Sequence, residues 1–367
     1  MANEFFIDEH TSALTKLVNE VVNDPTTYLG SKYLPSVALP VSRVRTEVIE
    51  ATGGLTLEHA MGTDPKHIQS FGSRVQEFAP PAYKEVMHWD EKKILHLREL
   101  GQNDPSKRGI RQYIDKAIDQ LNRRLEARIE LLRWRAIFDG GFTYMGKTFS
   151  YGIPAANRVA PLGALWSLDG INPNNSANPI ADIRYWVTGG SAKFRKYKIK
   201  KLVMSPNTSR WILENSNTKQ YISSIGAQAA IKEWGIDALM SYLLPGGPVI
   251  EVYNSWYQTE SLVDNGQGTG GKKIQVSDAI YFINDGEIFF EATLPDGDII
   301  GEFQQTLHLA SGTVDSPGYG KFLVVEENIA PGTKGGPQNP FIDICSGVNG
   351  GVNLQRAFDV LTAKVIA

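Results

Sequence analysis

Cysteine is nearly absent from this sequence, because Cys345 is the single cysteine among 367 residues. A disulfide within the chain is therefore impossible, and a metal or redox motif built on two cysteines is excluded. One cysteine suits a reducing compartment. No apolar run approaches the roughly 18–20 residues that cross a bilayer, so no membrane partner is expected. The first residues, MANEFFIDEHTSALTKLV, carry acidic residues and no apolar core, and they do not resemble a signal peptide.

Catalytic motifs are also scarce. None of the six histidines lies in an H-E-x-x-H spacing, and the chain has no G-x-S-x-G segment. The carboxylates are numerous but unclustered. The triplet His88-Trp89-Asp90 could suggest acid–base chemistry, but it lies where a loop is expected to meet a helix, and a structural role is favoured. The sequence therefore predicts no catalytic residue, no metal and no cofactor.

One glycine-rich segment is close to a phosphate-binding pattern. GQGTGGKK, residues 266–273, nearly matches G-x-x-x-x-G-K-[ST], a motif that needs a following helix and a hydroxyl for Mg²⁺. Lys273 takes the place of that hydroxyl, and the next residues, IQVSDAIYFI, have the composition of a strand. A flexible surface loop is the favoured interpretation. A nucleotide-binding enzyme that uses Lys272 remains a distant alternative.

Charge is close to balanced, with a net value of −3, so no strong field toward nucleic acid or membrane is implied. Basic residues nevertheless gather in KFRKYKIKK, residues 193–201. Its members are Lys193, Arg195, Lys196, Lys198, Lys200 and Lys201. With aromatic residues between them they could contact a phosphate backbone or face a pore. A solvated connection between a helix and a strand is the favoured interpretation.

The first ninety residues offer little core of their own. A short amphipathic helix is expected over Thr11–Val22, and Pro25, Pro35 and Pro40 then favour an extended arm. Two strand-like runs, VRTEVIE and SRVQEFAPPAYKEV, flank a polar, glycine-rich stretch. An isolated hairpin is marginally stable in water. We therefore expect this long excursion to lie on another surface.

The segment RGIRQYIDKAIDQLNRRLEARIELLRWRAIFD predicts a helix from about residue 105 to 139. Pro105 and Ser106 favour its start, and Gly140-Gly141 favours its end. The apolar residues repeat every 11 residues over three turns, close to a straight helix and unlike a heptad coiled coil. The stripe is narrow at first and broad near the end, which predicts a core there. The packing positions are Ile114, Ile118, Leu121, Leu125, Ile129, Leu132 and Trp134.

The remainder alternates between helical and strand patterns. FTYMGKTFSYGIP predicts a hairpin, and NPNNSANP predicts a joint. Residues 180–262 predict a mixed α/β unit, with helices in IADIRYWV, NTSRWILEN and QYISSIGAQAAIKEWG and strands in IKKLVMSP and GPVIEVYNSWYQT. Strand signals follow in IQVSDAIYFI, GEIFFEATLP and KFLVVEEN, and the last 27 residues predict one or two final strands.

This order of parts resembles the Hong Kong 97-type major capsid fold of tailed phages, and within it the lambda-type major capsid protein of the phage capsid E family. The resemblance is carried by YLPSVALPVSRVRTEVIE, GGLTLEHAMG, VQEFAPPAYKEV, HLRELG, KLVMSPNTSRWILEN and PVIEVYN. Their order and spacing, over most of the chain, are more specific than any single string. The implied fold class is α+β.

The resemblance implies a division of the chain. Residues 1–43 would be an N-terminal arm, 44–90 an extended loop on the neighbouring subunit, and 91–179 a peripheral domain with the long spine helix. Residues 180–262 would form the axial domain, 263–340 strands and loops of the peripheral domain, and 341–367 a strand that rejoins the axial domain. The extended loop would contact its neighbour through Arg45, Glu47, Leu55, Leu57, Phe71, Arg74, Glu77 and Phe78.

The implied function is structural rather than enzymatic. Members of this family self-assemble into hexamers and pentamers of an icosahedral shell that encloses double-stranded DNA. The resemblance implies a location in the virion after assembly in the host cytoplasm. The expected partners are further copies of the chain, a separate scaffolding protein, a portal, a decoration protein and non-specifically bound DNA. No Lys–Asn pair for cross-linking is identified. An encapsulin-like shell around an enzyme cargo is the alternative.

Overall fold

The computed structural model divides the chain into two compact units. The first contains Met1–Arg133 and Gly301–Gln355, and the second contains Trp134–Ile300 and Arg356–Ala367. The structure describes residues 28–50, 72–90, 92–94, 108–144, 147–166, 177–190, 194–224, 247–264, 272–294, 297–308, 318–328 and 341–366. No helix within these ranges is both long and apolar enough to cross a membrane.

The sheet of the first unit is built around one long strand, β19 (Phe341–Asn353). Over its first part, β19 pairs antiparallel with β4 (Ala82–Asp90) on one side and with β18 (Lys321–Asn328) on the other. Its last residues pair antiparallel with β15 (Glu302–Gln305), which pairs parallel with β1 (Ser36–Ala38). The central position of β19 therefore joins segments from three distant parts of the chain.

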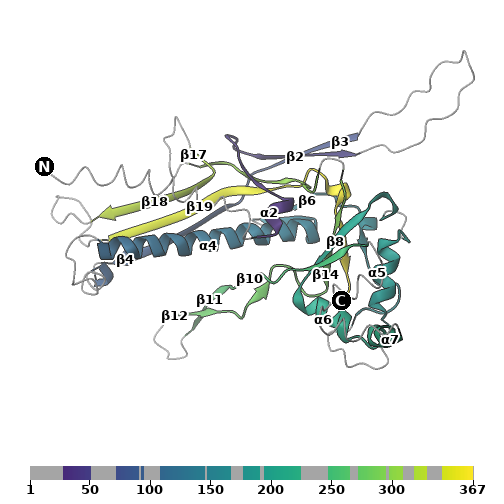
Figure 1. Ribbon diagram of the computed structural model, residues 1–367. Coiled ribbons are helices and arrows are strands. Elements are labelled where there is room, and N and C mark those ends of the chain that lie inside the picture. Colours follow the sequence, from purple (N-terminus) through teal and green to yellow (C-terminus); the bar gives the residue numbers. More distant parts are fainter. Residues whose placement is uncertain are drawn as a thin grey trace, which may run out of the picture. The chain divides into compact units, whose positions relative to one another are not determined.

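One face of this sheet is covered by α4 (Arg108–Asp139), the 32-residue helix. Figure 1 shows α4 running alongside β4, β18 and β19. Ile118 and Leu121 of the helix share a core with Leu323 and Ile344 of the sheet, together with Trp89 at the end of β4. The boundary between the two units falls inside this helix, between Arg133 and Trp134.

The second unit contains a five-stranded sheet in the order β7-β20-β14-β8-β9. The strands are β7 (Arg158–Val159), β20 (Leu361–Lys364), β14 (Glu287–Ala292), β8 (Ile199–Met204) and β9 (Val249–Val252). The inner three are antiparallel, and each edge strand runs parallel to its neighbour.

Three short helices pack on one face of the second sheet. They are α5 (Pro179–Val187), α6 (Pro206–Glu214) and α7 (Ser216–Ser224). Their buried residues Trp186, Ile212 and Ile222 join the core that includes Leu202 and Phe290 of the sheet. On the other face, Trp134 from the end of α4 packs against Tyr253 and Phe289, with ring centroids 5.6 and 6.0 Å away. The aromatic end of α4 is therefore part of a core.

The remaining described elements are short. Two-stranded pairs form between β2 (Val44–Glu50) and β3 (Gly72–Phe78), β5 (Gly141–Tyr144) and β6 (Lys147–Ser150), β10 (Trp256–Tyr257) and β13 (Ile280–Tyr281), β11 (Glu260–Asp264) and β12 (Lys272–Val276), and β16 (Leu307–His308) and β17 (Gly318–Tyr319). A single helical turn, α2 (Gly30–Tyr33), and three 3₁₀ turns (Ala155–Asn157, Phe194–Lys196 and Ala357–Asp359) complete the set.

Most local sequence predictions are confirmed where the structure describes the residues. The long helix ends at Asp139, and Gly140 follows with φ of 64°, a left-handed conformation that suits glycine at a helix end. The predicted hairpin after it is β5–β6. The predicted helix Thr11–Val22 and the part of the predicted helix after Ser224 lie outside the described residues.

Strand partnership differs from the sequence expectation at two places. Residues 287–292 were expected among strands that join the long helix, but β14 is the central strand of the second sheet, between β20 and β8. Residues 341–353 were expected in a segment that rejoins the other domain, but β19 is the centre of the first sheet. The physical reason is that the burial pattern of a strand shows which side chains are covered and not which strands lie alongside, whether the pattern is continuous, as in β14, or alternating, as in the first half of β19.

A buried lysine ties the first sheet to α4. The Lys321 side chain, at the start of β18, is only 3% exposed and contacts Glu126 of the helix. Contact with the carboxylate favours the charged amine, but burial disfavours it more strongly, and burial lowers the pKa of Lys321 to about 7. Between pH 7 and 10, Lys321 therefore keeps its proton in the unfolded chain and loses it in the folded chain.

This proton difference predicts pH-dependent stability. Because the lysine pKa is lower in the folded state, the free energy of unfolding should rise from pH 7 to pH 9 by about 1 kcal/mol per pH unit from this group. Urea unfolding of the wild type and of Lys321→Met across this range measures the effect. The slope should fall in Lys321→Met and stay unchanged in Lys92→Met, which alters an exposed lysine of the same unit. Equal slopes in all three proteins would contradict the assignment.

Candidate functional site

The hairpin of β2 and β3 presents one face to solvent. Arg45 lies opposite Glu77 in the strand register, and Glu47 lies opposite Val75, so these four side chains share a face. All four are exposed. A face with an opposite-charge pair and an exposed valine is suited to a partly polar protein contact.

The other face of the hairpin points into the first unit. Val44 and Thr46 alternate with the exposed residues and are fully buried. Phe78 is opposite Val44 and lies against β19, where a Cβ at Gly351 would be 2.9 Å from the Phe78 ring. Glycine at this position therefore allows the base of the hairpin to approach the sheet closely.

The structure describes only some of the residues that the sequence predicts for the extended-loop contact. Arg45, Glu47 and Glu77 lie together on the exposed face, whereas Phe78 is half-buried and lies against β19. Arg74 lies in β3. Leu55, Leu57 and Phe71 lie outside the described residues. The contact of these residues with a neighbouring subunit stays a prediction.

The predicted packing positions of the long helix lie on its inner side. Ile118, Leu121, Leu125, Ile129 and Trp134 are buried, and Ile114 and Leu132 are half-buried. Charged residues beside this stripe reach the sheet. Arg124 donates to the two carboxylate oxygens of Glu85 at 2.6 and 3.1 Å, and Arg128 lies over the Tyr83 ring. Polar contacts beside the narrow apolar stripe therefore also connect the helix to the sheet.

A buried ion pair in α4 holds the beginning of the described chain, and sequence reasoning missed it. The Gly30 backbone N–H donates to Glu130 Oε1 at 2.8 Å. Arg133 lies 3.3 Å from Glu130 Oε2 and donates to Ser36 Oγ at 2.8 Å. Both charged side chains are almost fully buried. The available signal was an i,i+3 pair of opposite charges inside the broadening apolar face, at Glu130 and Arg133.

The neighbouring Tyr28 is half-buried. Burial raises the pKa of Tyr28 above its usual value, and the Glu130 carboxylate raises it further. The phenol therefore stays neutral at physiological pH. Residues 28–36 are therefore connected to α4 through the buried side chains of Glu130 and Arg133.

Breaking this ion pair should be costly. Glu130→Gln keeps the side-chain shape but leaves the Arg133 guanidinium buried without its carboxylate, which should lower the free energy of unfolding by about 3 kcal/mol. Glu77→Gln, on the exposed face of the hairpin, should change it by less than about 0.5 kcal/mol. Urea unfolding compares the two variants. A stable Glu130→Gln variant would show that the pair does not anchor this segment.

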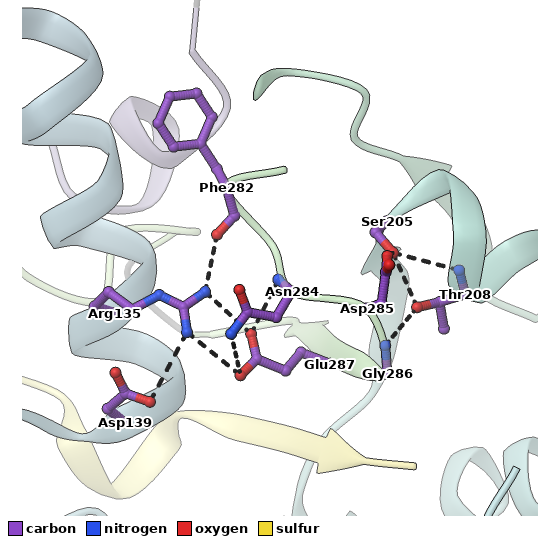
Figure 2. Close-up of polar contacts among 9 residues, drawn as sticks. All are labelled: Arg135, Asp139, Ser205, Thr208, Phe282, Asn284, Asp285, Gly286 and Glu287. Carbon is purple, nitrogen blue, oxygen red and sulfur yellow. Dashed lines mark hydrogen bonds and ion pairs between the residues drawn. The ribbon is translucent and has the colours of Figure 1, made fainter. Parts of the chain in front are cut away.

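In the second unit, the turn between β13 and β14 is held from two sides. Figure 2 shows Arg135, near the end of α4, reaching the turn from one side. Its guanidinium donates to Phe282 O at 3.0 Å and to the Glu287 carboxylate at 3.3 and 3.5 Å. Glu287 also accepts the Asn284 backbone N–H at 3.1 Å. The end of the helix is therefore fixed to the start of the central strand.

The N-terminus of α6 holds the same turn from the other side. Ser205 donates to Asp285 Oδ1 at 2.6 Å, and Asn207 donates to Asp285 Oδ2 at 2.9 Å. Thr208 Oγ1 accepts the Gly286 backbone N–H at 2.8 Å, as Figure 2 shows. The sequence predicted that α6 begins at Asn207 or Thr208, but not that its capping residues bind a turn about 80 positions away.

Removal of one acceptor tests the strength of this connection. Thr208→Val preserves shape and leaves the buried Gly286 N–H without its acceptor, so the free energy of unfolding should fall by about 1–3 kcal/mol. Thr188→Val removes an exposed hydroxyl bonded to Arg184 O and should have almost no effect. Thermal or urea unfolding measures both variants. Equal losses would show that the contact at Gly286 contributes nothing specific.

The basic run is partly neutralised by its surroundings. Lys200 lies 2.8 Å from Asp298, and Lys201 lies 2.9 Å from Glu251. Lys196 and Lys198 are exposed. Arg195 lies in the 3₁₀ turn Phe194–Lys196, and Lys193 lies outside the described residues. Contact of this run with DNA or a pore stays a prediction.

The structure around Lys272 and Lys273 differs from that of a phosphate-binding loop. Lys272 and Lys273 lie in β12, which pairs antiparallel with β11, and the next described element is the strand β13. No helix N-terminus follows the lysines to receive a phosphate. Residues 265–271 lie outside the described part, and within that part no group of three or more His, Cys, Asp and Glu residues could hold a metal ion.

Comparison with known proteins identifies a family. The sequence model of the family described as phage major capsid protein E matches residues 10–328. The putative capsid protein of a prophage of Escherichia coli CFT073 has a similar structure, with a TM-score of 0.52 and 14% sequence identity, over 97% of this chain and 99% of that chain.

Two further solved structures show lower similarity. A phage-related protein from Bordetella bronchiseptica RB50 has a TM-score of 0.46 and 10% identity, over 96% of each chain. A virus-like particle from Pyrococcus furiosus has a TM-score of 0.40 and 12% identity, over 97% of this chain and 99% of that chain. The family match covers most of the sequence, and the prophage similarity supports the α+β fold. The chain therefore belongs to the phage major capsid protein E family, has the Hong Kong 97-type fold, and is a structural capsid protein.

Proposed function

We propose that this chain self-assembles, as hexamers and pentamers, into an icosahedral phage head that encloses double-stranded DNA. The observation that carries this proposal is the hairpin of β2 and β3. Its base packs on β19, and its other face exposes Arg45, Glu47, Val75 and Glu77. A ribbon with an exposed face gains stability by lying on a neighbouring subunit.

The segments take the roles that the resemblance implies. Residues 1–43 are the N-terminal arm, residues 44–90 the extended loop, and residues 91–179 the peripheral domain with α4 as its spine helix. Residues 180–262 form most of the axial domain. Because β14 lies between β8 and β20, we assign residues 287–292 to the axial domain, and because β19 lies between β4 and β18, we assign residues 341–353 to the peripheral domain.

The proposed partners extend beyond further copies of the chain. A separate scaffolding protein and a portal would direct assembly in the host cytoplasm, and a decoration protein would bind the finished shell. Packaged DNA would contact the shell without sequence preference. Among the basic run, the exposed Lys196 and Lys198 suit such a contact better than Lys200 and Lys201, which are in ion pairs.

Electron microscopy of the purified chain tests assembly. Hollow particles or ring-shaped capsomers are expected. A stable monomer at high concentration in size-exclusion chromatography would contradict the proposal. Particles that contain a co-purifying enzyme and no DNA would favour the encapsulin-like alternative.

The extended loop can be tested separately. Glu50 and Gly72 are opposite each other at the end of the described ladder, so residues 51–71 can be replaced by Asn-Gly, which favours a two-residue hairpin turn. The shortened subunit should keep its circular dichroism spectrum and melting temperature, because the described base of the hairpin remains, and it should no longer form stable shells.

A matched control is available in the second unit. Asp264 and Lys272 are opposite each other at the end of the β11–β12 ladder, so residues 265–271 can be replaced by Asn-Gly in the same way. This variant should assemble normally. Normal shells from the variant without residues 51–71 would mean that the loop is not an essential contact between subunits.

A further inference from the structure

A buried histidine lies where β16 meets the sheet of the first unit. His308 is 3% exposed, and its ring packs on Phe322 of β18, with ring centroids 4.7 Å apart. Neither ring nitrogen has a hydrogen-bond partner within the described ranges of the chain. A neutral imidazole has one N–H donor and one acceptor nitrogen, and an imidazolium has two donors and a charge. The site therefore suits the charged form least, because a buried charge needs a partner.

A lysine next to this ring makes a proton on it still less favourable. Phe322 and Lys84 both lie opposite Gly347 of β19, and a Cβ at Gly347 would be 2.6 Å from the Phe322 ring and 3.1 Å from Lys84 Cγ. The Lys84 amine lies 5.5 Å from the centroid of the Phe322 ring. Burial lowers the pKa of His308 below its ordinary value of 6.5, and the Lys84 charge lowers it further.

The carboxylates on the same face of the sheet lie farther along the strands. Asp343 and Glu326 are opposite each other in the register, and Asp343 contacts His88 at 2.5 Å. Glu326 lies four residues along β18 from Phe322, about 13 Å at the usual rise of a strand. Neither carboxylate is therefore placed to pair with a protonated His308.

The other titratable groups near the ring add no negative charge. Lys321 of β18 contacts Glu126 of α4 and so lies on the opposite face of the sheet. Tyr319 of β17 is exposed. Burial raises the pKa of the Cys345 thiol in β19, so the thiol stays neutral. Protonation of His308 would therefore place a buried positive charge on the ring with no acid of the described residues to balance it.

β16 also connects the sheet to the segment that leads into β2. The Thr306 backbone N–H donates to Asn349 O at 2.7 Å, and the Asn349 side-chain amide donates to Leu307 O at 2.9 Å. The Leu307 backbone N–H donates to Val41 O at 3.0 Å, three residues before β2 begins. These groups are uncharged and cannot compensate a charge on the next residue, His308. The packing of His308 on the sheet therefore helps to hold the start of the β2–β3 hairpin.

From this arrangement we infer that His308 is a pH switch: protonation of its buried ring detaches β16 from the sheet and releases the hydrogen bond between Leu307 and Val41. The detached histidine is solvated and binds a proton more readily than the buried one. Detachment is therefore favoured as the pH falls below about 6.5, and the packed form is favoured above that value. The consequence for assembly rests on the proposed function, because the residues released lead into the hairpin that we assign to the extended loop.

Hydrogen exchange of the chain, below the concentration at which it assembles, tests the switch. The amides of Thr306 and Leu307 are followed at pH 7.5 and pH 5, and each rate is divided by the intrinsic rate at that pH. Their protection in the wild type should fall at least tenfold, because each pH unit below the ordinary pKa can favour the detached form up to tenfold. The amides of β14, in the second unit, should change little and serve as an internal reference.

Two histidine substitutions make this test specific. His308→Phe places a ring that cannot bind a proton next to Phe322, so it should keep the protection at pH 7.5 and abolish the loss at pH 5. His88→Gln is the matched control, because His88 is an exposed histidine of the same sheet, and the loss should remain. A loss in His308→Phe as large as in the wild type would overturn the inference.

An NMR titration of the wild type gives an answer even if His308→Phe does not fold. The imidazole signal with nuclear Overhauser contacts to the Phe322 ring is followed from pH 8 to pH 4.5. These contacts should disappear over the pH range in which the imidazole takes up its proton, and a protonated imidazole that keeps them would overturn the inference. Both measurements use the unassembled chain. Failure of the wild type to form shells would therefore contradict the proposed function and leave the result on His308 unaffected.

Discussion

The narrow apolar stripe of α4 limits what the first unit can bury. A 32-residue helix with one inward-facing line of isoleucine and leucine covers only part of a sheet face, and the charged residues beside that line must bind something or remain in water. In the structure, charged residues of the helix bind the sheet: Arg124 contacts Glu85, and Glu126 contacts Lys321. The helix thereby fixes β4 and β18 on both sides of β19.

The same constraint accounts for the buried charges. Glu130 and Arg133 lie where the stripe broadens, and they bind Gly30 and Ser36 of a segment almost 100 residues earlier. A buried pair of this kind contributes little net stability compared with apolar packing, but it fixes which groups meet. Positional specificity suits a structural protein, because small errors in the subunit would repeat in every copy of a shell.

In the second unit, burial is organised around β14, whose two faces are both covered. Phe290 belongs to the core with the three short helices, and Phe289 packs against Trp134. The turn before β14 is held by Arg135 on one side and by Ser205 and Thr208 on the other. Packing on both faces and polar contacts at the preceding turn therefore fix the centre of this sheet.

The sequence by itself determined the local elements: the helix of 11-residue period, its aromatic end, the hairpin after Gly141, and the strand and capped helix around Ser205. Periodicity and capping are local properties, so nearby residues suffice to indicate them. The i,i+3 spacing of Glu130 and Arg133 indicated an ion pair but not its contacts with Gly30 and Ser36. The burial of Asp182 had no such signal, because a charged residue in a helix usually faces water and only a tertiary contact shows that it is buried. Strand partnership also required the structure. β14 is buried on both faces, and the first half of β19 alternates between half-buried and buried side chains. Hydrophobic burial is non-directional, so neither pattern shows which strands lie alongside.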